Sequence, residues 1–224
     1  MPVYQLNSDQ KLELEFDDME ADYKNYYYSW QLCDYHWKPA NLNMFDYIKG
    51  FTQTRITTYR YSSIAFTRYT HYQAFLPDDN SRPTRSGNYL LKVYLDSDTS
   101  KLAFTKQVLV VETGASINAE VIQSFTPALF KTHQRIRFST MVKNLNAFSA
   151  AQQVKAVILQ NNRWDISQRD IAPTFVRGNV LEYNMESIGV FPGGKEWRWL
   201  DLRSFRLFSD RIDSGSYNTY SQKL

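Results

Sequence analysis

Two neighbouring stretches near the start of this chain alternate between apolar and polar residues, and they constrain the fold more than any other feature. In residues 12–16 leucine and phenylalanine alternate with glutamate, and in residues 26–32 tyrosine, tryptophan and leucine occupy every second position. Such alternation is typical of half-buried β-strands. The segment between them is acidic and lacks glycine and proline, so we expect a polar surface loop in which Asp17 and Asp18 act as turn residues.

Further short segments of the same kind fill the first half, separated by polar turns. A large share of aromatic residues, 16% of the chain, also favours β structure because rings pack well on a pleated surface. About seven strands in such a length are typical of an immunoglobulin-like sandwich. The predicted strands of this half cover residues 12–16, 26–32, 47–51, 55–61, 69–75, 89–94 and 102–111.

One local pattern supports an immunoglobulin-like or fibronectin-III-like first domain. Tyr89 follows a Ser-Gly-Asn turn, where such domains place a tyrosine whose hydroxyl bonds back to the preceding corner. Leu91 would then point into the core, and Trp30 would be the core indole of the third strand. The alternative is an ordinary turn followed by an ordinary strand.

The second half is predicted to form another β-sandwich. A polar segment, Thr113–Ser116, reads as a linker. Residues 154–159 are apolar on both parities, which predicts a central strand, and residues 191–195 are predicted to be a turn by composition. We therefore predict an all-β fold of two consecutive β-sandwich domains, an immunoglobulin-like one at 1–113 and a second at 114–224. The other strands predicted in this half cover residues 136–142, 181–184 and 197–202.

The last residues, 209–224, lose the alternation. They are either a mobile terminus or the place where a longer protein was cut, so the second domain is predicted to be truncated at its C-terminal end. The chain begins Met-Pro-Val-Tyr, without the basic and apolar regions of a signal peptide. A leader is therefore absent or was removed, and the compartment does not follow from these residues.

Composition disfavours several classes of partner. A formal net charge of +3 is too small to predict nucleic-acid binding. The sequence contains no run of about 18 apolar residues, the length that a transmembrane helix needs. Cys33 is the single cysteine, so no internal disulfide can form, and it reads as a small buried hydrophobe.

No catalytic or metal-binding pattern emerges. The three histidines, His36, His71 and His133, lie far apart without a second ligand at metal-binding spacing. His71 lies within a predicted strand and is expected to be a hydrogen-bonded or surface imidazole. Adjacent carboxylates such as Asp78 and Asp79 read as turn residues, because acids that act as a pair must flank a substrate. We expect no enzyme activity, no cofactor and no metal site.

Aromatic side chains are the candidate partner-binding residues: Tyr35, Trp37, Trp197 and Trp199. Tyr35 and Trp37 follow a predicted strand and lie in a loop, where exposed rings anchor interfaces or stack on sugars. The alternatives are that Trp37 folds back to cap the sandwich and that Trp197 and Trp199 lie in a core. If these rings are exposed and coplanar, the chain is instead a carbohydrate-binding β-sandwich module of an exported protein, with a glycan as its ligand.

Several ordered segments resemble the N-terminal region of the type IX secretion system Plug proteins of Bacteroidota: Phe16–Tyr28, Cys33–Asp34, Trp37–Leu42, Gly87–Tyr94 and Arg198–Arg206. The resemblance extends over nearly the whole chain. Members of that family are longer, which implies a missing C-terminal part and a missing leader peptide.

The resemblance implies a non-enzymatic, exported protein of the periplasm that associates with the outer membrane. It implies a large outer-membrane β-barrel translocon as the partner, whose periplasmic opening the protein closes when no cargo is engaged. It also implies that the protein meets the membrane only through a protein partner and binds no nucleic acid. The family has no catalytic residue, and no binding motif that could be mapped position by position onto this sequence.

Overall fold

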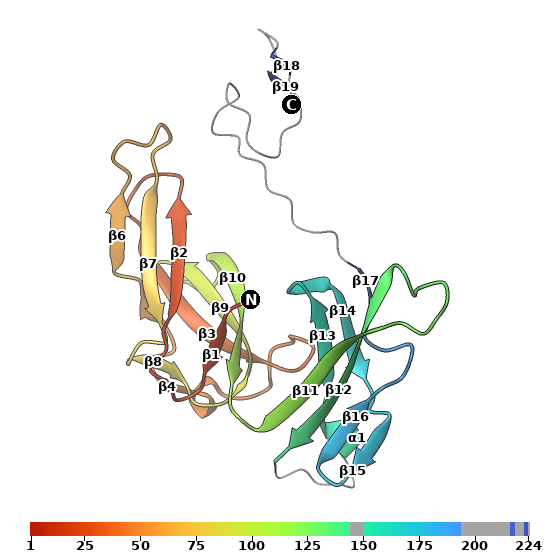
Figure 1. The fold of residues 1–224 in the computed structure, drawn as a ribbon. Helices are drawn as coiled ribbons and strands as arrows, with labels where there is room; N and C mark the ends of the chain where they lie inside the picture. The colour runs from red at the N-terminus through yellow and green to blue at the C-terminus, as the bar shows by residue number, and fades with distance from the viewer. Residues whose placement is uncertain (144–149, 194–215, 218–221, 224) are drawn as a thin grey trace. The chain divides into compact units, whose positions relative to one another are not determined.

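The computed structural model describes residues 1–143, 150–193, 216–217 and 222–223, and their regular structure is almost entirely β-strand (Figure 1). The helical elements among them are a single turn, η1 (Met44–Asp46), and the four-residue α1 (Ala150–Gln153). The prediction of an all-β fold is confirmed.

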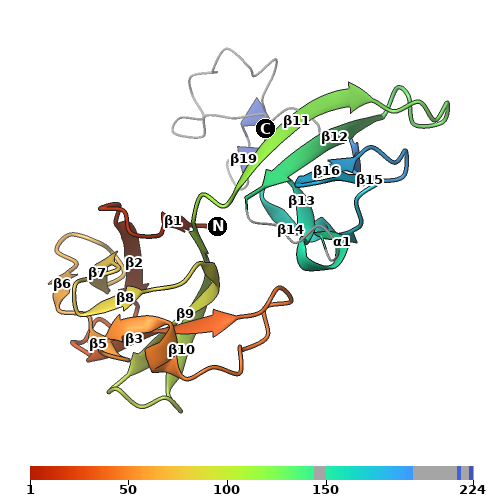
Figure 2. The same ribbon diagram turned by 90° about the horizontal axis from the view of Figure 1, so that it is seen from below.

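The first ten strands form what we call the N-terminal sandwich. Its larger sheet has the order β1-β10-β9-β3-β5, with β1 parallel to β10 and the other pairs antiparallel; Figure 2 shows β3, β9 and β10 side by side. A three-stranded sheet, β2-β7-β6, and the pair β4-β8 complete it. The strands are β1 (Val3–Gln5), β2 (Leu12–Asp18), β3 (Tyr26–Cys33), β4 (Ile48–Gly50), β5 (Thr54–Arg55), β6 (Thr58–Tyr61), β7 (Thr70–Leu76), β8 (Ser81–Pro83), β9 (Gly87–Leu95) and β10 (Leu102–Val111).

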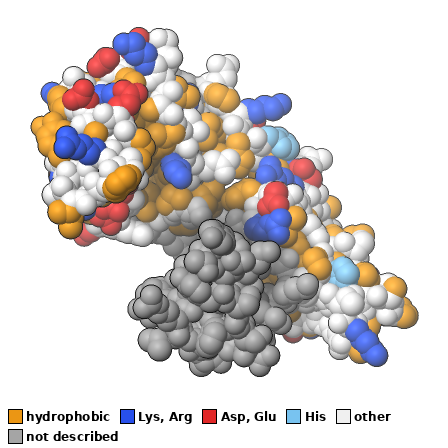
Figure 3. Space-filling view, turned by 90° about the horizontal axis from the view of Figure 1, so that it is seen from above, with side chains coloured by type: hydrophobic (Ala, Val, Ile, Leu, Met, Phe, Trp, Pro, Cys, Tyr) orange, Lys and Arg blue, Asp and Glu red, His pale blue; other side chains and the backbone are white. Residues whose placement is uncertain are grey.

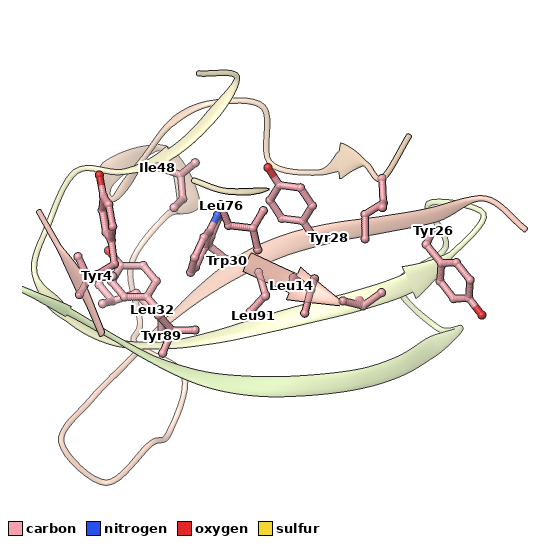
Figure 4. Packing of buried hydrophobic residues seen from close by; sticks show 14 of the residues in the cluster. Tyr4, Leu14, Tyr26, Tyr28, Trp30, Leu32, Ile48, Leu76, Tyr89 and Leu91 are labelled. Carbon is pink, nitrogen blue, oxygen red and sulfur yellow. The ribbon is translucent and has the colours of Figure 1, made fainter. Parts of the chain in front are cut away.

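The apolar parity of these strands forms one core between the sheets (Figure 4). Tyr28 and Trp30 from β3 meet Leu14 from β2 and Leu76 from β7 there, all of them buried. Because β2 pairs with β7 and β3 pairs with β9, the connection from β2 to β3 crosses between sheets. The prediction of a polar loop rather than a tight hairpin is thus confirmed.

Tyr89 has the geometry that the sequence predicts. Its hydroxyl donates to the Arg85 carbonyl at 2.9 Å, its ring is fully buried, and it meets Trp30 edge to face at 6.0 Å. Leu91 is buried on the same side of β9. The orders β10-β9-β3 and β2-β7-β6 are compatible with an immunoglobulin-like sandwich, and that finer assignment stays a prediction.

Two expectations for this half are wrong in detail. Asp17 and Asp18 are not turn residues, because β2 continues through both and Asp18 is buried. The stretch 55–61 is not one strand: it is divided between β5 and β6, which belong to different sheets, and the buried Ile56 lies between them.

The second half contains a sheet with the order β11-β12-β16-β15, in which β17 also pairs with β12, and a separate pair, β13-β14. Phe138 stacks on Tyr183 at 4.3 Å between β12 and β16. The elements are β11 (Ala115–Gln123), β12 (His133–Val142), β13 (Ala156–Gln160), β14 (Arg163–Ile171), β15 (Phe175–Arg177), β16 (Val180–Tyr183), β17 (Val190–Pro192), β18 (Ser216–Tyr217) and β19 (Gln222–Lys223).

Three expectations for this half need correction. Ala115 and Ser116 begin β11 rather than ending a linker. β13 is not central, since β14 is its one pairing partner in the described part of the chain. Phe191 is not in a turn: it is buried in β17, because this segment pairs with β12 and so continues the sheet. The predicted strand 197–202 lies outside the described residues.

Contacts divide the chain into two compact units, Met1–Ala119 with Phe138–Met185, and Glu120–Arg137 with Glu186–Leu224. In the second unit, Glu186 organises the chain around its carboxylate. It accepts from the Phe125 amide at 2.8 Å and from the Ser124 hydroxyl at 3.1 Å, and it pairs with the buried Arg135 at 3.5 Å. The division into domains at residues 113 and 114 stays a prediction.

Candidate partner-binding surface

The connection between β6 and β7 exposes large apolar side chains more fully than any other part of the N-terminal sandwich. Ile64 is 98% exposed and Phe66 is 107% exposed, the value of a side chain with no neighbour. The loop lies at the end of the β2-β7-β6 sheet that is remote from β4 and β8 (Figure 1). We call residues Thr58–Leu76 the aromatic hairpin.

A chain of aromatic contacts anchors the aromatic hairpin to the core. Tyr59, which is 41% exposed, lies 4.7 Å from the Tyr23 ring, 5.7 Å from Tyr61 and 6.0 Å from Tyr72, measured between centroids. Tyr72 is fully buried and stacks on Phe16 at 5.2 Å. The exposed rings are therefore backed by buried ones, which lowers the entropy lost when a partner covers them.

The neighbouring β2–β3 connection is fixed by the Asp18 carboxylate. Asp18 accepts from Lys24 Nζ at 2.9 Å, from the Tyr26 hydroxyl at 2.9 Å and from the Glu20 amide at 3.0 Å. Burial acts to raise the pKa of Asp18, but these three donors outweigh it, so the pKa lies below its ordinary value. The Glu20 and Asp18 carboxylates raise the pKa of Lys24, and burial followed by the bond to Asp18 raises that of Tyr26.

His71 lies near the loop end of β7, where it is opposite Arg60 of β6 and Asp17 of β2. Its Nδ1 lies 2.7 Å from Asp17 Oδ1, and Glu15 is within 3.6 Å of Nε2. The expectation of a hydrogen-bonded imidazole in a strand is confirmed. The pair crosses from β2 to β7 and helps to hold their register.

Charges around the hairpin tip are mixed. Residues 58–69 contain Arg60 and Arg68 and no acid, while the adjacent residues 17–24 contain four acids and one lysine. Figure 3 views this end of the sandwich, where orange side chains lie beside blue and red ones. Partial desolvation, with Tyr59 and then Asp22 nearby, raises the pKa of the Tyr61 hydroxyl, which stays a neutral donor at pH 7.

The structure shows two of the four aromatic residues that sequence patterns suggested for partner binding. Tyr35 and Trp37 are half-buried. Within the first unit, the Tyr35 hydroxyl accepts from the Asp170 amide at 3.0 Å, and the Trp37 ring meets Trp164 at 5.7 Å with the planes 87° apart. Trp197 and Trp199 lie outside the described residues.

Sequence patterns did not identify the tip of the aromatic hairpin. The stretch between residue 61 and residue 69 reads as a connection, and connections are expected to be polar. The available signal was the pair Ile64 and Phe66 in a segment with turn-like serines. The tip is exposed because no other segment packs against it, and only the tertiary structure shows this.

The described part of the chain contains no candidate metal site. No group of three or more histidine, cysteine, aspartate or glutamate side chains could hold a metal ion there. Cys33 is buried, as predicted, and burial raises the pKa of its thiol. Among the described residues, no helix has the length and apolar character needed to cross a bilayer.

The family model described as "Type 9 secretion system plug protein 1st domain" matches residues 1–112, half of the chain. The chain belongs to this family. Membership confirms the resemblance inferred from its ordered segments. It assigns this plug-family chain a role related to type 9 secretion, in the cell envelope, and the family is not a known enzyme family.

A crystal structure at 2.30 Å of a hypothetical protein from Parabacteroides merdae ATCC 43184 is similar in fold, with a TM-score of 0.84 and 27% sequence identity. The similarity covers 98% of the plug-family chain and 55% of that protein, so the chain spans about half the length of this relative. No curated protein matches the chain.

Proposed function

We propose that the chain is a non-enzymatic plug-type subunit that closes the periplasmic side of the type 9 outer-membrane translocon pore. The match of residues 1–112 to the first domain of the plug family is the observation that carries the proposal. The partner is then the large outer-membrane β-barrel translocon, and the location is the periplasmic face of the outer membrane.

The aromatic hairpin is the surface proposed to meet the translocon. A plug has to enter or cover an opening, and this element ends in a loop in which Ile64 and Phe66 are almost fully exposed. Tyr59 and Tyr61 stand behind them, and tyrosine is enriched among residues that dominate binding energy. The buried rings of Tyr72 and Phe16 give this surface a stiff support.

Charge favours a protein partner over lipid or nucleic acid. Four acids at residues 17–24 outnumber one lysine there and two arginines in the aromatic hairpin. An anionic bilayer or a phosphate backbone selects a clear excess of basic residues. We therefore propose that the chain meets the membrane only through its protein partner.

Tyr35, Trp37, Trp197 and Trp199 remain proposed contact residues with a smaller role. The glycan-binding alternative required exposed, coplanar rings. Trp37 is half-buried with its ring nearly perpendicular to Trp164, so it does not favour that alternative.

The test of the proposed function is co-purification of the full-length protein with the translocon from cells that lack cargo adaptors. The double variant Ile64→Ser/Phe66→Ser should recover at least about tenfold less translocon, since each lost anchor removes roughly 1–2 kcal/mol. Cells carrying it should also admit a large antibiotic through the unsealed pore. Its urea midpoint should equal that of the wild type, because both side chains are exposed.

Phe175→Ser is the matched control, because Phe175 is also exposed, at 57%, but lies in β15. It should leave recovery and permeability unchanged. If the wild-type protein recovers no translocon at all, the plug role is wrong. If the double variant recovers as much as the wild type, the role stands and the aromatic hairpin is not its contact surface.

A further inference from the structure

The outer face of the five-stranded sheet carries a hollow that the plug role does not use. Its volume is about 470 Å³, within the range of about 300–1,000 Å³ seen for small-ligand sites. Its floor comes from alternate residues of β3 and β9, and its walls come from the segments around residues 44–53 and 99. The lining residues are Ser29, Gln31, Met44, Thr52, Gln53, Lys92, Tyr94 and Thr99.

The polar groups of the floor are held in place. Ser29 and Tyr94 are 4% and 6% exposed although they face away from the core, and their hydroxyls lie 3.5 Å apart. Gln31 donates to the Tyr47 hydroxyl at 3.4 Å, and Gln53 accepts from the Ser97 hydroxyl. The floor therefore offers oriented hydroxyl and amide groups at little further entropic cost.

Lys92 is the one charged residue among those that line the hollow. It is half-buried on a central strand, and no ion pair to it forms within the described residues. The nearby acids are already engaged: Asp96 pairs with Lys101 at 3.2 Å, and Asp98 accepts from the Ser100 amide at 2.9 Å. The lining thus contains a cation and no anion, which suits a ligand that supplies a carboxylate.

Two exposed phenylalanines are sequence neighbours of lining residues. Phe45 directly follows Met44 and is 73% exposed. Phe51 directly precedes Thr52 and is 65% exposed. Asn43 caps the turn that carries Phe45, through a bond from the Phe45 amide at 3.1 Å. Two exposed phenyl rings beside amides and a single cation match the mixed chemistry of a peptide better than that of a sugar acid.

We propose that this hollow binds a short acidic peptide segment, with its carboxylate on the Lys92 ammonium and a neighbouring apolar side chain on Phe45 and Phe51. The site differs from the aromatic hairpin in residues and in sheet, so it does not depend on the plug role. It gives the chain a second protein-binding function, the capture of an extended segment.

The test is fluorescence anisotropy with the full chain and a labelled peptide, Thr-Phe-Glu-Ser-Phe-Ser, compared with its glutamine counterpart. The glutamate peptide should bind at least tenfold more tightly. Lys92→Met keeps the aliphatic stem and removes the charge. It should therefore lower the affinity for the glutamate peptide about tenfold and leave the affinity for the glutamine peptide unchanged. Lys92→Arg should restore binding to within a few-fold.

Lys106→Met is the control, because Lys106 is an exposed lysine of β10 that does not line the hollow. It should bind like the wild type. Equal affinity for both peptides, or unchanged binding by Lys92→Met, would overturn the proposal. Amide shifts at Ser29 and Thr52 on addition of glucuronic acid, together with no binding of either peptide, would overturn it too, in favour of a sugar acid. Amide shifts at Ser29 and Thr52 on titration check that binding occurs in the hollow.

Discussion

At the scale of single residues, the most informative group is the Asp18 carboxylate. The residue is 8% exposed; its partners Glu20 and Lys24 lie in the following connection, and Tyr26 is the first residue of β3. An unpaired buried carboxylate would be strongly destabilising, so these three donors account for an acid at this position. Asp18 thereby fixes the path of the chain as it crosses between the two sheets.

Asp18→Asn should lower the free energy of unfolding by about 1–3 kcal/mol at pH 7, because the Lys24 ammonium loses the buried one of its two carboxylate partners and keeps only the exposed Glu20. The folded-state pKa of Asp18 lies below its unfolded value, so its contribution is complete above the ordinary value of 3.8 and disappears as pH falls through the folded pKa. Urea denaturation at pH 7, 5 and 3 measures this.

The control for that experiment is Asp9→Asn, since Asp9 is exposed and no hydrogen bond or ion pair joins it to the described residues. It should change stability by less than about 0.5 kcal/mol at every pH. A cost of Asp18→Asn that stayed constant down to pH 3 would show that shape, and not charge, determines the effect.

At the scale of elements, the β4-β8 pair depends on a close backbone approach. Gly50 ends β4 with a φ of +99°, and a Cβ added there would lie 2.7 Å from the Asn80 carbonyl carbon. Both the backbone conformation and the contact exclude a side chain. The pair lies next to the segment that walls the hollow, so Gly50 also supports the position of Phe51 and Thr52.

Gly50→Ala should therefore cost about 2 kcal/mol or more of unfolding free energy, because the Asn80 backbone cannot move away cheaply. It should also lower the affinity for the acidic peptide, since the substitution shifts the wall of the hollow. Thermal and urea denaturation, together with the anisotropy titration, measure both effects.

Gly114→Ala is the comparison variant, because a Cβ at Gly114 meets no atom within 4 Å. It should be nearly neutral in stability and in peptide binding. Similar losses for both variants would indicate that chain flexibility, rather than the contact with Asn80, sets the cost.

The elements also show where sequence patterns succeed and fail. Alternation located β2, β3, β9 and β10 well, since each has one face in the core and one outside it. It missed β14, whose residues are mostly half-buried or exposed on both parities and so carry little periodic signal. Likewise the exposure of the aromatic hairpin tip and the depth of the hollow arise from contacts between distant segments.

At the scale of the whole molecule, the N-terminal sandwich contains its own core. The buried cluster extends from Tyr4 to Val110, within the residues that match the first domain of the plug family. This buried cluster includes no residue from the second half of the chain. The sandwich is thus expected to be a folding unit.

A fragment of residues 1–112 should fold alone and unfold cooperatively in urea, with about 5 kcal/mol or more of stability. Trp30 and Trp37 are its two tryptophans, and Trp30 is fully buried. In the fragment with Trp37→Phe, fluorescence should report a buried indole that becomes exposed in one transition.

The full chain with Trp37→Phe provides the comparison, although its remaining tryptophans add signal. A fragment that binds a hydrophobic dye and lacks a cooperative transition would mean that the sandwich needs the rest of the chain. Agreement between fluorescence and far-ultraviolet circular dichroism midpoints would support a two-state folding unit.

The amino-acid sequence alone determined that this protein is all-β, that Trp30, Tyr89 and Leu91 are buried, and that its family is that of the secretion plugs. Local periodicity and ordered segments carry these features, because they depend on residues close in the chain. Only the tertiary structure decided that Asp18 is buried, that Ile64 and Phe66 stand free and that Lys92 lines a hollow. Each of these depends on which distant segments lie beside the residue, and pairing between strands, not sequence distance, sets that neighbourhood.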